Sequence, residues 1–463
     1  MRRRLLLLST ILLSADIFCP AVRAELRGGC ARTNITPPVG VWLSGYGSRD
    51  RPSDDIVDEL WAKAVVLSDG HNTVAIVATD LLWVPLQITK KIRGIVKEKT
   101  GIPEDHVLIS ATHTHFGPKI FAKTKIGPDV PGNTVDEAYV QTLIRKIADS
   151  VFLAHRNMKD VRIGAAKGEI PEIVHNRRPR NSDGSVTMAF SLSPEALATR
   201  KIVSDPDGSV RVTFTHPPEG PAMTFGPVDP EAWVLRIEDT DGEVVACIVN
   251  FACHAVSGSA YPDWFYSISA DFPGETMRVV EQAEGGICLF TAGTTGDIVP
   301  IKRGRWPRLQ IGRALAGEVL KRLQFVRTSN EVATSAMRKQ VKLPVKPDPS
   351  PDRITDAGTE DKHLTTEIQV IRLGDVYILG LPGEVLVEVG LQIKKRAGLQ
   401  NLLIVSLSND AIGYVCHSEA YDEGGYEPGT GTNLAKGAAE ILIEQALALI
   451  DEMRADTAAR KTP

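Results

Sequence analysis

The sequence predicts an α/β protein in which mixed β-sheets are flanked by helices. Hairpin patterns recur along the chain, and segments with the helical spacing of apolar residues lie between them. Short apolar runs near these segments have the length of buried strands. Hairpins give antiparallel strand pairs and strand–helix units give parallel pairs, so the two patterns together favour sheets of mixed direction.

Three β-hairpins are predicted where a Gly-containing turn separates two β-rich segments. The paired segments are 61–67 with 73–80, 234–237 with 243–251, and 368–373 with 376–380. Each second segment leads to a polar residue, namely Asp80, His254 or Glu384. Because α/β proteins carry much of their chemistry at strand ends, these three residues are candidate site residues.

Helices and buried strands are predicted for most of the remaining chain. A helix that includes 88–96 is expected to start near Pro85. Similar patterns predict helices near 135–154, 273–282, 309–325, 385–396 and 434–453, and apolar runs predict strands at 107–112, 287–292 and 402–407. The Pro-rich segments 193–227 and 346–361 are expected to be irregular, either as walls of a substrate cleft or as plain surface insertions.

The first 24 residues have the pattern of a secretory signal peptide. Met1 is followed by three arginines and a mostly apolar stretch, and Ala24 is a small residue suited to cleavage. The apolar stretch is too short to span a bilayer, and no later segment has the composition of a membrane span. We therefore expect an exported protein, periplasmic or extracellular, in which residues 25–463 form a single domain.

Composition and charge exclude one class of function. The net charge is −4 at pH 7, and the sequence has no basic stripe of the kind that binds nucleic acid. The hydrophobic content of 43% is ordinary for a globular enzyme. The cysteines after the leader lack zinc-knuckle spacing, so we expect them to pack as small apolar side chains, with at most one or two disulfides.

The strongest chemical signal is the step His113-Thr114-His115 after the predicted strand 107–112. In a strand, residues i and i+2 point to the same side, so the two imidazoles are expected to face one side together. Such a pair binds a metal jointly, or one ring binds the metal while the other transfers protons. Two surface histidines are the alternative interpretation.

Three residues far along the chain support a metal site. His254 follows an apolar strand, Glu384 follows the turn Leu381-Pro382-Gly383, and Tyr414 lies in a Gly-Tyr-Val step. Taken singly, they also fit a core histidine, an acid at a helix N-terminus and a buried aromatic residue. Two histidines and a carboxylate are nevertheless a ligand set typical of hydrolytic zinc.

These residues lie in ordered motifs that resemble the N-terminal catalytic domain of neutral (non-lysosomal) ceramidases and their short bacterial relatives. The motifs are NITPP (34–38), GYG (45–47), SATHTH (110–115), NR (176–177), VDPE (228–231), NFACH (250–254), SADFPG (269–274), GD (296–297), LPGE (381–384) and GYV (413–415). They extend over most of the chain after the leader. The resemblance implies a layered α/β/β/α-like fold, without the C-terminal immunoglobulin-like domain of the full-length enzymes.

The resemblance also implies a role for each site residue. Zn²⁺ would be held by His113, His254, Glu384 and Tyr414. Three further residues would be catalytic, with proton transfer assigned to His115 and contact with the developing oxyanion assigned to Arg177 and Tyr426. The implied protein is a secreted zinc-dependent hydrolase that cleaves a linear amide with zinc-bound hydroxide as the nucleophile. Its substrate would be a small or lipid-like N-acyl compound, which is compatible with transient contact with a membrane surface.

One departure from the resemblance bears on the mechanism. Val299 stands where ceramidases have a serine after the Gly-Asp step, so no hydroxyl nucleophile is available at that position. Two alternatives remain open from the sequence. One is a zinc-dependent ester or lactone hydrolase, and the other is a catalytically silent extracytoplasmic binding protein on the same scaffold.

Overall fold

The computed structural model describes residues 25–121, 132–215, 223–258, 264–349, 359–360 and 362–461. The predicted leader lies outside the described residues, as do parts of both Pro-rich segments. None of the described helices is long and apolar enough to cross a membrane.

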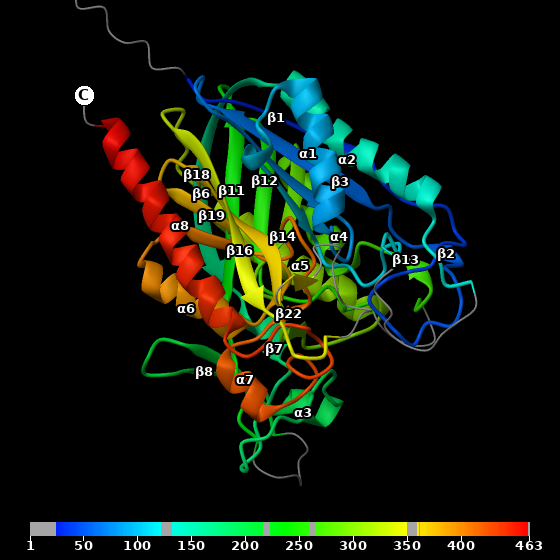
Figure 1. The fold of residues 1–463 in the computed structure, drawn as a ribbon. Helices are drawn as coiled ribbons and strands as arrows, with labels where there is room; N and C mark the ends of the chain where they lie inside the picture. Colours follow the sequence, from blue (N-terminus) through cyan, green and yellow to red (C-terminus); the bar gives the residue numbers. More distant parts are fainter. Residues whose placement is uncertain are drawn as a thin grey trace, which may run out of the picture.

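The larger sheet has eight strands and carries the first two predicted hairpins (Figure 1). Across the sheet the strands are β14 (Ile287–Ala292), β12 (Val244–Phe251), β11 (Glu231–Asp239), β6 (Lys159–Glu169), β1 (Arg27–Asn34), β3 (Trp61–Ser68), β4 (Thr73–Thr79) and β5 (Val107–Ala111). The pairs at the two edges, β12 with β14 and β4 with β5, are parallel, and the other pairs are antiparallel. β1 and β6 pair over only two register positions, so the sheet consists of two halves joined at a narrow contact.

The smaller sheet has five strands and carries the third predicted hairpin. Its strands are β16 (Thr334–Pro344), β18 (His363–Leu373), β19 (Val376–Gly380), β21 (Leu402–Val405) and the short β17 (Thr359–Glu360) beside β18. β19 and β21 are parallel and the remaining pairs are antiparallel. Both sheets are therefore of mixed direction, as the sequence predicts.

Helices cover the outer faces of both sheets (Figure 1). The eight-stranded sheet packs against α1 (Leu86–Thr100), α2 (Glu137–Arg156), α4 (Asp271–Glu284) and α5 (Arg305–Leu323). The five-stranded sheet packs against α6 (Val387–Ala397) and α8 (Ala438–Lys461). Each of these six helices includes one of the ranges predicted from apolar spacing or overlaps most of it.

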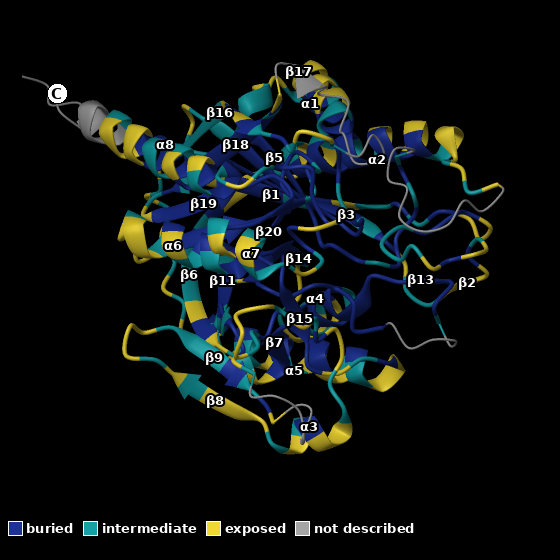
Figure 2. Ribbon diagram, turned by 60° about the horizontal axis from the view of Figure 1, so that its bottom comes forward, coloured by how far each residue is buried: buried dark blue, intermediate teal, exposed yellow. Residues whose placement is uncertain are grey.

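Side chains along the strands alternate between two apolar layers. In β4, Ala75 and Val77 join the cluster beneath the helices, whereas Val74 and Ile76 face the five-stranded sheet. A third cluster lies between the five-stranded sheet and its own helices. Figure 2 shows the buried residues concentrated in the strands. The order helix, sheet, sheet, helix confirms the layered α/β/β/α architecture.

Shorter strands and helical turns lie in the loops that connect these layers. The two-stranded pairs are β2 (Asp55–Ile56) with β13 (Ser267–Ile268), β7 (Val174–Asn176) with β15 (Ile298–Pro300), and β20 (Glu384–Val385) with β22 (Tyr414–Val415). The remaining helical turns are η1 (Glu104–His106), η2 (Pro171–Ile173), α3 (Pro194–Ala198) and α7 (Ser418–Glu423). All five described cysteines are free, and all except Cys30 are buried.

The structure corrects two predictions of local structure. The segment 193–227 is not wholly irregular, because it contains α3 and the three-stranded sheet of β8 (Lys201–Ser204), β9 (Val210–Thr213) and β10 (Pro227–Val228). Its β-branched residues pair across the Asp-Gly turn at 207–208. The strand predicted over 107–112 ends at Ala111, because the chain turns sharply at His113, whose φ is 66°.

Candidate metal centre

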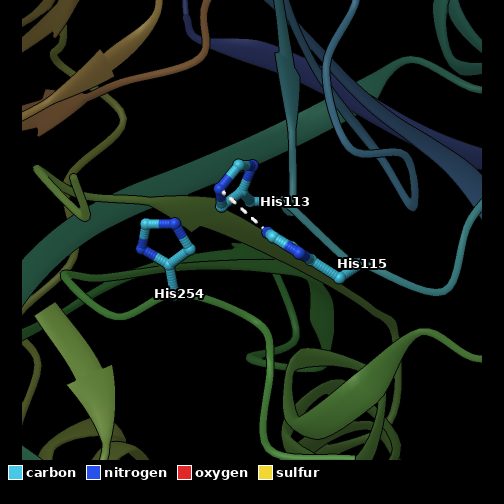
Figure 3. A group of neighbouring side chains, drawn as sticks. All are labelled: His113, His115 and His254. Carbon is cyan, nitrogen blue, oxygen red and sulfur yellow. Dashed lines mark hydrogen bonds between the residues drawn. The ribbon is translucent and has the colours of Figure 1, made fainter. Parts of the chain in front are cut away.

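His113, His115 and His254 form a cluster in which one ring nitrogen of each lies within 4.8 Å of the others. His113 and His115 follow β5, and His254 follows β12, in the other half of the eight-stranded sheet. His113 and His254 are fully buried. Figure 3 shows the three rings turned toward one another, with the contact between His113 and His115 dashed.

The two histidines of the His-Thr-His step come together for a different reason from the one predicted. They lie beyond the end of β5, so strand alternation does not place them. Instead His113 adopts a φ of 66°, a region that costs a non-glycine residue on the order of 1 kcal/mol or more. The two rings meet edge to face, with centroids 4.9 Å apart, and their Nε2 atoms are 3.5 Å apart.

Glu384 completes the cluster with a carboxylate. Its Oε2 lies 3.2 Å from Nε2 of His113 and 3.2 Å from Nε2 of His254. Glu384 pairs in register with Tyr414 in the short parallel contact of β20 with β22. Gly383 permits this close approach, because a Cβ at that position would lie 2.4 Å from the Gly413 carbonyl oxygen. Residues predicted separately from the sequence are thus neighbours in space.

Backbone carbonyls orient the two buried imidazoles. Nδ1 of His113 contacts the Leu82 carbonyl at 2.9 Å, and Nδ1 of His254 contacts the Thr295 carbonyl at 2.5 Å. Because a carbonyl only accepts hydrogen bonds, each Nδ1 carries the proton when the ring is neutral. Each Nε2 then presents a lone pair to the centre of the cluster, which is the usual arrangement of metal-binding histidines.

Some polar atoms at the centre have no hydrogen-bond partner among the described residues. They are Nε2 of His254 and Oε2 of Glu384. A buried polar atom without a partner costs about 1–3 kcal/mol, so an unmatched cluster of this kind needs a compensating group. Two imidazole nitrogens and a carboxylate oxygen are the donors that Zn²⁺ prefers. The residues present therefore fit a divalent metal ion.

The electrostatics of the cluster favour the forms that bind a metal. Burial, followed by the positive charge of Arg177, lowers the pKa of His254 to about 3, so its imidazole is neutral at neutral pH. Burial raises the pKa of Glu384, but the neighbouring His113 and His254 outweigh it and hold that pKa well below its usual range. A neutral imidazole and an ionised carboxylate are the ligand forms of these side chains.

Tyr414, Arg177 and Tyr426 lie together on one side of the cluster. The Tyr414 ring stacks near His254, with centroids 6.5 Å apart and an interplanar angle of 14°. Nη2 of Arg177 donates to the Tyr414 hydroxyl at 3.1 Å, and the Tyr426 ring lies 5.5 Å from the Tyr414 ring. Burial, followed by the Glu384 charge, raises the pKa of Tyr414 well above its usual range. All seven predicted site residues therefore converge on one place.

Aromatic side chains also lie beside His115. The Tyr46 ring lies 5.0 Å from the His115 ring and 5.2 Å from the Phe265 ring. Arg49 is buried beside them and donates to the His115 carbonyl at 2.8 Å. The sequence motif GYG marked this loop only through the family resemblance. Nothing in the sequence indicated a role in the site for Arg49 or for the carbonyls of Leu82 and Thr295.

Val299 lies in the core and not among the polar groups of the cluster. It is fully buried in β15, where it pairs in register with His175 of β7. Next to it, the amide of His254 donates to the Ile298 carbonyl at 2.9 Å. The segment that carries Val299 thus supports His254 through its backbone.

Fold and site together define a class. The chain is a layered α/β protein whose loops gather three histidines, a glutamate and a tyrosine around a centre suited to a divalent metal. Arginine and tyrosine donors flank this centre on one side.

The sequence is similar to those of neutral ceramidases. The sequence profile of "Neutral/alkaline non-lysosomal ceramidase, N-terminal" matches residues 27–186, about a third of the chain. The neutral ceramidase of Pseudomonas aeruginosa is 22% identical over 98% of this chain and 76% of its own length. That of Mycobacterium tuberculosis is 22% identical over 84% of this chain and 71% of its own length.

A solved structure shows the same fold. The crystal structure of neutral ceramidase from Pseudomonas aeruginosa superposes with a TM-score of 0.69 at 18% identity, covering 93% of this chain and 75% of that chain. The chain is thus similar to the neutral ceramidases in sequence and in fold, which confirms the resemblance read from its motifs.

Proposed function

We propose that the protein is an exported zinc-dependent hydrolase that cleaves a linear N-acyl amide bond. The observation that carries this proposal is the pair of buried imidazole nitrogens 3.2 Å from one carboxylate oxygen. His115 lies beside His113, and Arg177 is hydrogen-bonded to Tyr414. The relatives are named neutral ceramidases, which supports a ceramide-like N-acyl lipid as the substrate class.

The metal would be held by His113, His254 and Glu384, with Tyr414 as the fourth ligand. When bound, zinc lowers the pKa of a coordinated water toward about 7 and polarises a carbonyl group. The protein's contribution is to hold the two imidazoles in the correct tautomer through the Leu82 and Thr295 carbonyls.

His115 is the proposed proton-transfer residue. Burial and the neighbouring His113 and His254 lower its pKa well below the usual range, so the imidazole is neutral and ready to accept a proton. Its Nε2 faces the cluster, 3.5 Å from Nε2 of His113. In the proposed reaction Nε2 of His115 accepts a proton while the amide carbonyl is attacked, and it then delivers that proton to the leaving amine.

Arg177 and Tyr426 are the proposed contacts for the oxygen of the substrate carbonyl. Both lie beside Tyr414 on the same side of the cluster. A guanidinium or phenol that meets the developing negative charge contributes roughly 3 kcal/mol by analogy with other oxyanion donors.

The test combines metal analysis with matched N-acyl and ester substrates. We expect bound zinc in the purified protein and loss of N-acyl hydrolysis on chelation. His113→Ala is expected to lose both metal and activity. His115→Ala is expected to keep the metal but to lose about 10²–10⁴-fold in kcat.

Other results would point elsewhere. Faster turnover of esters than of all N-acyl compounds would favour the ester or lactone hydrolase. Absence of bound zinc together with no chelator-sensitive activity would favour a silent binding protein. His115→Ala with full turnover would remove the role given to His115.

A further inference from the structure

A single buried carboxylate joins two consecutive arginines beside the metal centre. Oε1 of Glu427 accepts from Nε of Arg177 at 2.8 Å, and Oε2 accepts from Nη1 of Arg178 at 2.6 Å. The Glu427 side chain is 0% exposed, and those of Arg177 and Arg178 are 5% and 4% exposed. These three side chains are called the arginine bridge below. Nothing in the sequence pattern assigned a role to Glu427.

Arg177 depends more than Arg178 on Glu427 as a counter-charge. A buried guanidinium needs a counter-charge and partners for its donors. Arg178 has a second carboxylate, Glu423, at 3.3 Å, and it also donates to the Gly424 carbonyl at 2.9 Å. Within the described ranges, Glu427 is the only carboxylate within ion-pair distance of Arg177.

The guanidinium is planar and rigid, so the partner of Nε sets the direction of the two terminal nitrogens. With Nε of Arg177 bonded to Glu427, Nη2 donates to the Tyr414 hydroxyl at 3.1 Å and to the Gly296 carbonyl at 2.9 Å. Nη1 makes no hydrogen bond to a described residue. It is therefore the donor left for a ligand.

We infer that Glu427 is a positioning residue for the reaction. It turns Arg177 so that Nη2 meets the Tyr414 hydroxyl and Nη1 is presented to the substrate oxygen. This inference rests on the proposed function, because Arg177 acts on substrate only if the cluster hydrolyses an acyl bond. A purely structural bridge would stabilise the fold and leave turnover by the folded protein unchanged.

The experiment compares three variants of the full chain. Glu427→Gln removes the charge at nearly the same shape. Glu427→Asp keeps the charge but shortens the side chain, so the carboxylate no longer spans both arginines. This variant also tests the inference if Glu427→Gln folds poorly. Glu423→Gln is the matched control, because Glu423 contacts Arg178 and Arg180 but not Arg177.

We expect both Glu427 variants to lose about 10²-fold in kcat, the cost typical of a misplaced group, with little change in KM. Zinc content and thermal midpoint are measured on the same samples, and zinc is expected to stay at the wild-type level. Glu423→Gln is expected to keep wild-type kcat. Lower thermal midpoints with unchanged kcat per folded molecule would overturn the inference, as would equal losses in Glu423→Gln.

Different results would contradict the proposed function and the role of Glu427. Wild-type protein without chelator-sensitive hydrolysis overturns the proposed function and the inference with it. Active wild-type protein with a fully active Glu427→Asp variant overturns the inference alone.

Discussion

Gly45 lies against the His115 imidazole and leaves no room for a side chain there. A Cβ at Gly45 would come within 2.6 Å of Cγ and Nδ1 of His115. Its φ of 99° is also a conformation that L-residues rarely adopt. Space and backbone thus both require glycine, and the requirement falls on the residue proposed to carry the proton.

Gly45→Ala is expected to lower kcat by about 10²-fold, because the methyl group displaces the His115 ring from its place beside His113. Gly40→Ala is the matched control, since Gly40 has a similar φ of 94° but a Cβ there would meet no described atom within 4 Å. Both variants are expected to lose about 1 kcal/mol of stability from the strained backbone. Steady-state kinetics and thermal unfolding measure the two effects. Equal kcat in the two variants would contradict the role of His115.

At the scale of elements, His417 ties α7 to α6. It lies at the N-terminus of α7, forms an ion pair with Glu388 in the first turn of α6, and contacts Glu419 at 3.1 Å. Burial alone would lower the pKa of His417. The contacts with the two carboxylates outweigh it and raise the pKa to about 9.

The raised pKa makes this link depend on pH. A histidine whose pKa is higher in the folded than in the unfolded protein stabilises the fold fully below about 6.5, and that contribution is lost as the pH rises through about 9. His417→Gln is therefore expected to cost up to about 3 kcal/mol near pH 6 and much less at pH 10. Urea unfolding across this range measures the difference from wild type. A difference that stays constant with pH would contradict the ion pair, and the same change at the exposed His71 serves as the control.

The elements themselves were largely predictable from the sequence. The hairpins β3–β4, β11–β12 and β18–β19 have alternating β-rich segments around Asp-Gly or Gly-Asp turns, and such signals are local. The strands β8 and β9 were not predicted because the prolines of segment 193–227 favour irregular structure, although four residues on each side suffice for the pairing.

The sequence pointed to residues that lie together in the structure, but not to the geometry of their arrangement. His254 and Glu384 stood out because each follows a strand, and the resemblance supplied the remaining roles. Glu427 lies between a tyrosine and a proline in a Gly-rich loop, where nothing local marks a buried acid. Its partners, the two arginines, are about 250 residues away, and only the folded chain brings them together.

At the scale of the whole molecule, Arg93 joins layers that are far apart in the sequence. It is fully buried in α1, donates to the Val107 carbonyl of β5 at 2.9 Å, and pairs with Glu367 of β18 at 2.5 Å. Its Nη2 also reaches Gln369 at 3.2 Å. One side chain thus connects the helical layer, the edge of the large sheet and the small sheet.

Arg93→Met is expected to destabilise the protein by about 3 kcal/mol, because it leaves the buried Glu367 carboxylate with Arg338 as its remaining ion-pair partner. Arg396→Met removes an exposed ion pair with Glu444 and is expected to leave stability almost unchanged, because solvent screens such pairs. The free energy of unfolding in urea measures both. Similar losses in the two variants would contradict the linking role of Arg93.

The metal centre takes its donors from both halves of the large sheet and from the loops that follow the small one. His113, His254, Glu384 and Tyr414 span about 300 residues, so during folding the centre forms only after distant segments have met. A chain that has folded only its first half carries His113 and lacks the other three donors. Because metal binding energy becomes folding energy in such a site, ion capture would mark the moment at which the last layers dock. Partly folded chains would then be inert toward the proposed substrate.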